Sequence, residues 1–113
     1  LEIIRYLLDR LQVATKVVLL SELGVEARGG RLPIEICGKM GARRFLVQES
    51  AGKYLDSRLF REAGIELEYF KCPSPVYPQL WGNFVPNLSA FDLVFNCGPK
   101  ARDIMMARTR PAR

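Results

Sequence analysis

The sequence predicts an α/β fold, in the form of a three-layer, Rossmann-like partial domain whose short, mainly parallel sheet is flanked by helices. Three observations predict it. Segments with the three- and four-residue apolar period of helices alternate with short apolar runs typical of strands. The links between them are short and often contain glycine or proline. Helices that alternate with strands over short links imply right-handed crossovers onto a parallel sheet.

The first forty residues predict two helices and one strand. Leu1–Leu11 is expected to be an amphipathic helix, because its apolar residues fall on one stripe, at Ile4, Leu7, Leu8 and Leu11. Lys16–Leu20 is short, β-branched and apolar, which favours a strand covered on both faces. Leu32–Met40 is predicted to be a helix, with Pro33 in its first turn and Gly41 as its C-terminal stop.

Two further strands and a helix are expected between residues 44 and 70. Arg44–Gln48 predicts a strand, and Asp56 predicts the N-cap of a short helix that Gly64 ends. Ile65–Phe70 alternates apolar and acidic residues, a pattern typical of a strand with one face in water. We therefore place that strand nearer the sheet edge than Lys16–Leu20.

A long proline-rich loop and a capped helix follow. Cys72–Leu88 contains four prolines and three aromatic residues, and a loop of this length in so small a domain indicates binding or packing over the core. Ser89 is expected to be the N-cap of the next helix, with Asp92 as the second residue of a capping box. Gly98 and the proline after it end that helix.

Composition excludes several classes of function. The 113 residues, 49% of them hydrophobic, suit one small domain or a piece of one, and no apolar run approaches the roughly 18 residues of a membrane span. The chain has no histidine, the commonest metal ligand and general base. Its three cysteines form no Cys-x-x-Cys pair. We expect no metal, no cofactor, and a reducing cytoplasmic environment.

The charge of +5 is unevenly placed. Residues 99–113 contain five cations and one acid, whereas residues 1–98 are close to neutral. We interpret residues 99–113 as a terminal helix and a basic, flexible tail, and expect no nucleic-acid partner.

Three groups of polar residues are candidate functional positions. Ser50, Gly52 and Tyr54 follow one strand, where backbone amides could hold an anion, although this is also an ordinary strand-to-helix loop with Tyr54 packed down. Glu22 follows the first predicted strand, where an acid could orient a hydroxyl or amine; the alternative is a solvated loop residue. The densest set accompanies the proline-rich loop and the following helix, where Trp81 could stack on a sugar; capping and core packing are its alternative explanation. Its members are Tyr77, Gln79, Asn87, Ser89, Asp92 and Asn96.

One segment resembles the C-terminal part of the WbqC-like protein family. The resemblance lies in Tyr77-Pro-Gln79, Phe84–Ser89, Asp92-Leu93 and Phe95–Gly98, and shorter pieces agree in order from Leu1 onward. It covers residues 1–98, which we expect to be the C-terminal half of a WbqC-like α/β domain. The family's first half opens with a strand and a His-Gln-Pro type motif that is absent here. Because the chain also starts without methionine, we expect it to be a fragment that is inactive alone.

The resemblance implies a role in bacterial surface-polysaccharide, or O-antigen, biosynthesis, namely transfer of glycine or another small acyl group to an amino sugar. From the resemblance together with the polar set, we expect Asp92 or Glu22 to be the proton acceptor. The residues it implies for substrate binding are Tyr77, Gln79, Ser89, Asn96, Ser50, Gly52 and Tyr54. The family tends toward Ser-Ser-Asp-Leu where this chain has Leu20-Ser-Glu-Leu23, which weakens the case for Glu22. The alternative function is a module that binds a nucleotide-sugar or another small molecule without chemistry. The expected partners are that ligand and the missing N-terminal half.

Overall fold

A computed structural model describes residues 1–107 of the chain. The chain divides into two compact units, which we describe separately. The central unit is Val17–Lys71. The terminal unit combines Leu1–Lys16 with the described residues from Cys72 onward.

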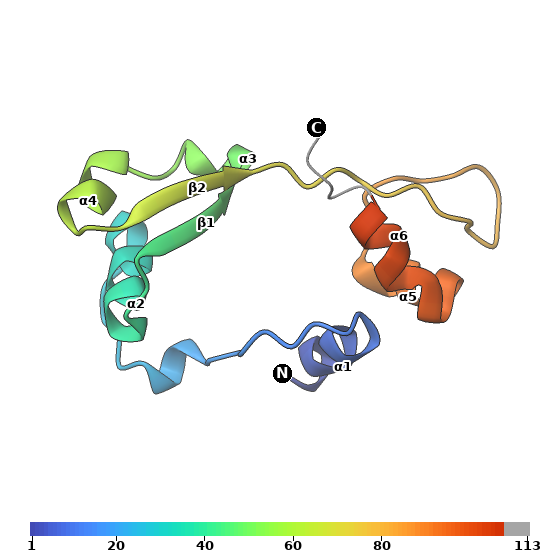
Figure 1. Cartoon of the computed structure of the whole chain (residues 1–113), viewed down its shortest axis with the longest axis horizontal. Coiled ribbons are helices and arrows are strands. Elements are labelled where there is room, and N and C mark those ends of the chain that lie inside the picture. Colours follow the sequence, from blue (N-terminus) through green and yellow to red (C-terminus); the bar gives the residue numbers. More distant parts are fainter. Residues whose placement is uncertain (108–113) are drawn as a thin grey trace. The chain divides into compact units, whose positions relative to one another are not determined.

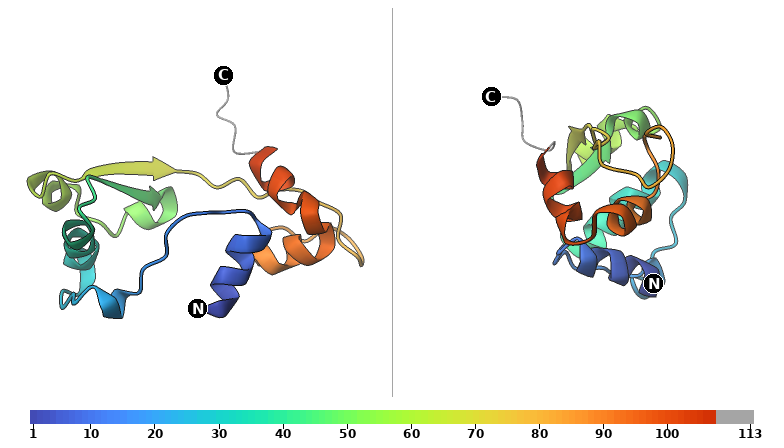
Figure 2. Two further views of the ribbon diagram at one scale, coloured as in Figure 1. Left: turned by 60° about the horizontal axis from the view of Figure 1, so that its bottom comes forward. Right: turned by 90° about the vertical axis from the view of Figure 1, so that its right-hand side faces the viewer.

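The central unit is built on a two-stranded parallel sheet (Figures 1 and 2). Strand β1 (Arg44–Gln48) pairs with β2 (Glu66–Phe70) in a register that aligns Arg44 with Glu66 and Gln48 with Phe70. The unit's other elements, in chain order, are η1 (Leu20–Glu22), η2 (Gly29–Arg31), α2 (Leu32–Met40), α3 (Glu49–Gly52) and α4 (Ser57–Glu62). Both strands expected in this region are confirmed, and the mixed helix and strand content agrees with the predicted α/β class.

Local chemistry explains where the helices of this unit begin and end. Pro33 occupies the first turn of α2, and Gly41 ends that helix in the left-handed conformation, with φ of 64°. The Asp56 carboxylate accepts a hydrogen bond of 3.0 Å from the backbone N–H of Arg58 and so caps α4. Gly64 follows α4 with φ of 72°. These caps and stops are the ones that the sequence predicts.

The core of the central unit lies between one face of the sheet and the helices α2 and α4. Cys37, Phe60 and Ile65 form its main buried cluster, in which Phe60 is 1% exposed, and Val47 on β1 is also buried. The ring of Phe45 on β1 packs 5.6 Å from that of Phe60. On the opposite face of the sheet Leu46 is 60% exposed. Within the described residues of this unit, α2 and α4 therefore contribute to the same side of the sheet.

The strand predicted for Lys16–Leu20 is wrong. Residues 16–19 form no regular element, and Leu20 begins the short helix η1. Val17, Leu19 and Leu20 are 38% to 47% exposed, so the apolar run does not have the cover on both faces that was expected. An apolar run is typical of a strand only where neighbouring strands pair with it. The described sheet consequently has two strands where the sequence predicted three.

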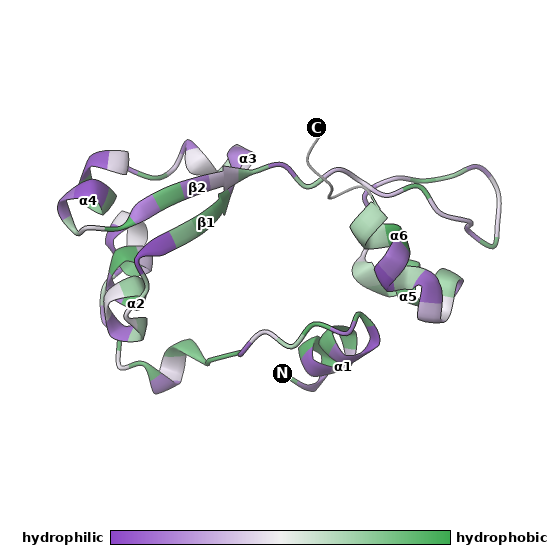
Figure 3. Ribbon diagram, in the orientation of Figure 1, coloured by the Kyte–Doolittle hydropathy of each residue, from purple (hydrophilic) through white to green (hydrophobic). Residues whose placement is uncertain are grey.

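The terminal unit is helical. It contains α1 (Glu2–Arg10), α5 (Ala90–Cys97), η3 (Gly98–Lys100) and α6 (Ala101–Ala107), with the proline-rich segment between β2 and α5. Figure 3 shows both hydrophilic and hydrophobic residues on α1, in agreement with its predicted amphipathic character. Arg108, Arg110 and Arg113, which were expected to form the basic tail, lie outside the described residues.

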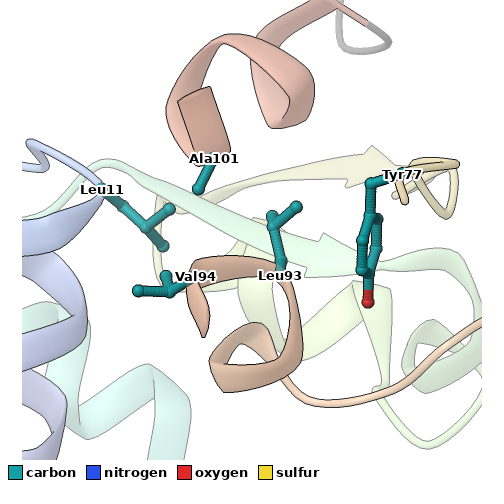
Figure 4. Packing of buried hydrophobic residues seen from close by; sticks show 5 residues of the cluster. All are labelled: Leu11, Tyr77, Leu93, Val94 and Ala101. Atoms are coloured by element: carbon teal, nitrogen blue, oxygen red, sulfur yellow. The ribbon is translucent and has the colours of Figure 1, made fainter. Parts of the chain in front are cut away.

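Five buried side chains form the core of the terminal unit (Figure 4): Leu11, Tyr77, Leu93, Val94 and Ala101. Ala101, at the start of α6, has no exposed surface. Arg102 then joins α6 to the end of α1, because its Nη1 donates to the carbonyl oxygens of Leu11 (2.8 Å) and Gln12 (2.7 Å). Among residues 1–107, no helix is long and apolar enough to cross a membrane.

Candidate functional site

The proline-rich loop of the terminal unit is closed by one side-chain amide. Gln79 Oε1 accepts from the backbone N–H of Val85 (2.8 Å), and Gln79 Nε2 donates to the carbonyl oxygen of the same residue (2.9 Å). The amide thus satisfies both backbone groups of Val85, as a neighbouring strand would. Gly82, between the two residues, has φ of 67°, a conformation that glycine adopts readily. Residues 79–85 therefore form a closed loop with Trp81 on it.

Asp92, in the first turn of α5, holds this loop to the helix. Its Oδ2 accepts from the Tyr77 hydroxyl (2.7 Å) and from Gln79 Nε2 (3.0 Å), and its Oδ1 accepts from Asn96 Nδ2 (3.1 Å). Asn96 Nδ2 also donates to the Asp92 carbonyl oxygen (2.8 Å), and Asn96 Oδ1 accepts from the backbone N–H of Leu80 (3.1 Å). We call Tyr77, Gln79, Asp92 and Asn96 the loop network.

The capping arrangement at the start of α5 is only partly as expected. Ser89 is the N-cap, and its hydroxyl oxygen accepts from the backbone N–H of Phe91 (3.2 Å). Asp92 is not the reciprocating acid of a capping box, because its carboxylate faces the Tyr77, Gln79 and Asn96 donors. A phenol and two amides supply more hydrogen bonds to that carboxylate than the one backbone N–H at Ser89 would.

The network keeps the Tyr77 hydroxyl protonated. Burial raises the pKa of Tyr77 above its usual value, and the hydrogen bond to Asp92 raises that pKa further. Burial, followed by the charge of Asp92, also raises the pKa of the Cys97 thiol on the same helix. Tyr77 therefore remains a hydrogen-bond donor to Asp92 well beyond neutral pH, which preserves the loop network.

A pocket of about 390 Å³ lies between the loop and α5. We call it the loop pocket. Three of its apolar side chains are largely exposed, namely Trp81 (84%), Leu80 (77%) and Phe95 (71%). The polar side chains of the pocket bond mainly to one another and to the loop backbone, so its accessible surface is mostly aromatic and aliphatic. The complete lining is Gln79, Leu80, Trp81, Val85, Leu88, Asp92, Phe95 and Asn96.

The structure brings together five of the nine predicted site residues. Tyr77, Gln79, Asp92 and Asn96 bond to one another, and Ser89 caps the same helix. Asn87, also singled out in the sequence, has φ of 59°, and its backbone N–H donates to Ser74 Oγ (3.3 Å). Sequence reasoning did not single out Leu80, Val85, Leu88 and Phe95. The available signal was that Leu80, Leu88 and Phe95 each stand next to a polar residue of the predicted set.

The other four predicted site residues belong to the central unit. Ser50 and Gly52 lie in α3, which begins directly after β1, and a Cβ at position 52 would collide with the Tyr69 ring of β2. Tyr54 is 75% exposed, so the alternative that it packs down onto the core is wrong. Glu22 is exposed at the end of η1. Because no strand precedes Glu22, this residue does not lie at the carboxyl edge of a strand, where the sequence placed it.

Among residues 1–107, no group of three His, Cys, Asp or Glu side chains could hold a metal ion.

The mixed helices and strands and the loop pocket define an α/β protein with a small-molecule-sized pocket formed by a loop and a helix. The chain matches the WbqC-like protein family over residues 1–104, and it therefore belongs to that family.

One curated relative is the uncharacterized protein Rv1507c of Mycobacterium tuberculosis (strain ATCC 25618 / H37Rv). It is 37% identical to this chain over 71 residues, which are 62% of this chain and 31% of the relative. The chain thus covers about a third of the relative's length. No solved structure matches the chain.

Proposed function

We propose that this chain is part of a WbqC-like protein of bacterial surface-polysaccharide, or O-antigen, biosynthesis, and that the loop pocket binds an amino sugar. In the same proposal the whole protein works in the cytoplasm, transfers glycine or another small acyl group, and completes the two described strands into a Rossmann-like sheet. Family membership supports the general role. The observation that carries the binding site is an exposed tryptophan beside a hydrogen-bonded carboxylate in a pocket of about 390 Å³.

The chemistry of the loop pocket suits a sugar ring. A pyranose has apolar C–H faces and polar edges, so one face can stack on an aromatic ring while hydroxyl or amino groups bond to polar atoms nearby. Trp81 and Phe95 offer the aromatic surfaces. Of the roughly four lone-pair positions of the Asp92 carboxylate, three are used by the loop network, which leaves about one on Oδ1 for a ligand. An ammonium or hydroxyl of the sugar is the group that this position would accept.

The transfer itself needs a proton acceptor. The sugar amine attacks the carbonyl carbon of an activated acyl donor, the C–N bond forms, the bond to the leaving group breaks, and the amine loses a proton. Asp92 or, as the alternative, Glu22 is the proposed acceptor of that proton. Ser89, Ser50, Gly52 and Tyr54 remain predicted binding residues. Asp92 has the additional role of holding the loop.

The chain's single tryptophan makes the binding proposal directly testable. Titration with glucosamine should change Trp81 emission in a saturable manner, because the ring is 84% exposed and water around it would be displaced. Asp92→Asn should weaken binding by roughly tenfold, since it places an amide N–H₂ or a weaker acceptor opposite the donors of the loop network. Asp103→Asn, an exposed acid on α6, is the matched control and should bind as the parent does. No emission change with glucosamine would contradict the proposal.

A binding module without chemistry is the second candidate. The observation that favours it is that the Asp92 carboxylate already accepts three hydrogen bonds. The two candidates differ in one experiment on a full-length family member. If Asp92 is the base, its replacement by Asn abolishes transfer of the acyl group at saturating sugar. If the protein is a binding module, the parent binds the sugar and transfers no acyl group, and the Asp92 variant differs from it in binding alone.

A further inference from the structure

The terminal unit contains a second pocket, of about 380 Å³, that adjoins the loop pocket. We call it the arginine pocket. Phe95 lines both pockets, and α1 and α5 pack against each other within this unit. Two pockets of similar size that share one side chain suit a ligand with two parts. The lining of the arginine pocket is Tyr6, Asp9, Arg10, Gln12, Val94, Phe95, Gly98 and Pro99.

An arginine is held in place in this second pocket. The Arg10 guanidinium carbon lies 5.2 Å from the centroid of the Tyr6 ring, and that ring stacks on Phe91, with centroids 6.3 Å apart. Stacking on an aromatic ring orients a guanidinium and leaves its N–H edge free to bond. Arg10 is still 58% exposed in its side chain. Its planar set of donors therefore remains accessible to a ligand in the pocket.

The charges around the arginine pocket favour an anion. Asp9 partly compensates Arg10, but the two side chains are 4.0 Å apart, at the limit of an ion pair, and Asp9 is 78% exposed. The end of α1 would itself disfavour an anion, because helix C-termini carry partial negative charge. Arg102 covers that end through its bonds to the carbonyl oxygens of Leu11 and Gln12. Arg10 and Asp9 are the charged residues that line the pocket, and Arg102, bonded to the backbone beside it, adds one further positive charge.

We infer that the arginine pocket is a subsite for a phosphate or diphosphate attached to the sugar in the loop pocket. Arg10 would donate its guanidinium N–H groups to the phosphate oxygens, a pairing that arginine makes with good geometry. The ligand of the terminal unit is then a sugar phosphate or a nucleotide-sugar, and a free sugar would use only half of the site. This inference rests on the proposed function, since it takes the sugar in the loop pocket as given.

Calorimetry of the whole chain tests the phosphate subsite with three probes, which are glucosamine, glucosamine 1-phosphate and UDP-glucosamine. We expect both phosphorylated probes to bind at least about tenfold more tightly than glucosamine, as a charge-assisted contact implies. If the one-phosphate probe shows the whole gain, the ligand is a sugar phosphate. A further gain with UDP-glucosamine indicates a nucleotide-sugar.

The variant Arg10→Gln should remove this gain and leave glucosamine binding unchanged. Arg10→Lys, which retains the charge but not the planar donors, should keep part of the gain. Arg5→Gln is the matched control, because Arg5 lies on the same helix, is exposed and does not line the pocket. The inference is overturned if glucosamine and its phosphates bind equally well, or if Arg10→Gln keeps the full gain. If none of the three probes binds, the proposed function itself fails.

Discussion

Removing the Gln79 side chain should open the loop without unfolding the helices around it. Gln79→Ala deletes three hydrogen bonds: two to the backbone of Val85 and one to the Asp92 carboxylate. The two backbone bonds are exposed, and we assign each about 0.5 kcal/mol; the bond to a charged group contributes more, so the total is about 2 kcal/mol. Asp92 retains its bonds to Tyr77 and Asn96, which keeps it in place on α5.

Hydrogen exchange of the Val85 amide measures this effect directly. That N–H is bonded to Gln79 Oε1, so a loss of about 2 kcal/mol should speed its exchange roughly thirtyfold. The Leu80 amide, bonded to Asn96, should respond less. Gln48→Ala, at the exposed end of β1 in the central unit, is the matched control and should leave both amides unchanged. Unchanged exchange at Val85 in Gln79→Ala would refute the claim that the Gln79 amide holds the loop closed.

Three further outcomes are expected. Tyr77→Phe should lower the free energy of unfolding by about 1 kcal/mol. Because the pKa of Tyr77 is raised in the folded state, the parent should lose stability in denaturant titrations as pH rises above about 10, from the unfolded pKa through the folded one, and the variant should lose less. An unaltered pH profile would argue against the buried bond to Asp92. Ala101→Leu should destabilise the terminal unit by about 1–3 kcal/mol, since Ala101 is fully buried and the extra atoms have no space, and a thermal midpoint equal to the parent's would contradict that packing. Gly52→Ala should destabilise the central unit through a clash with Tyr69, and Tyr69→Ala in the same chain should relieve most of the clash, as seen in amide exchange of β2.

Features governed by local chemistry could be predicted from the sequence. The stop at Gly41 and the caps at Asp56 and Ser89 depend on the residue itself and its immediate neighbours, and all three were confirmed. The strand at Lys16–Leu20 was wrong because pairing depends on a partner strand elsewhere, about which an apolar run contains no information.

The candidate site, too, could be predicted from the sequence only in part. The sequence marked Tyr77, Gln79 and Asp92 as a polar set among apolar neighbours, and the structure joins them by hydrogen bonds across 13 and 15 residues. It could not reveal that these polar atoms bond mostly to one another. That property depends on side-chain direction, and it leaves Trp81, already expected to stack on a sugar, and its apolar neighbours as the main accessible surface.

The most direct test of the central claim is amide chemical-shift mapping of the whole chain during a glucosamine titration. If the loop pocket binds the sugar, saturable shifts should concentrate in residues 79–88 and 92–96, where the loop and α5 line the pocket, and the indole N–H of Trp81 should move with them. The amides of β1 and β2 should stay in place. Shifts that concentrate in the central unit, or no shifts at all, would contradict the account.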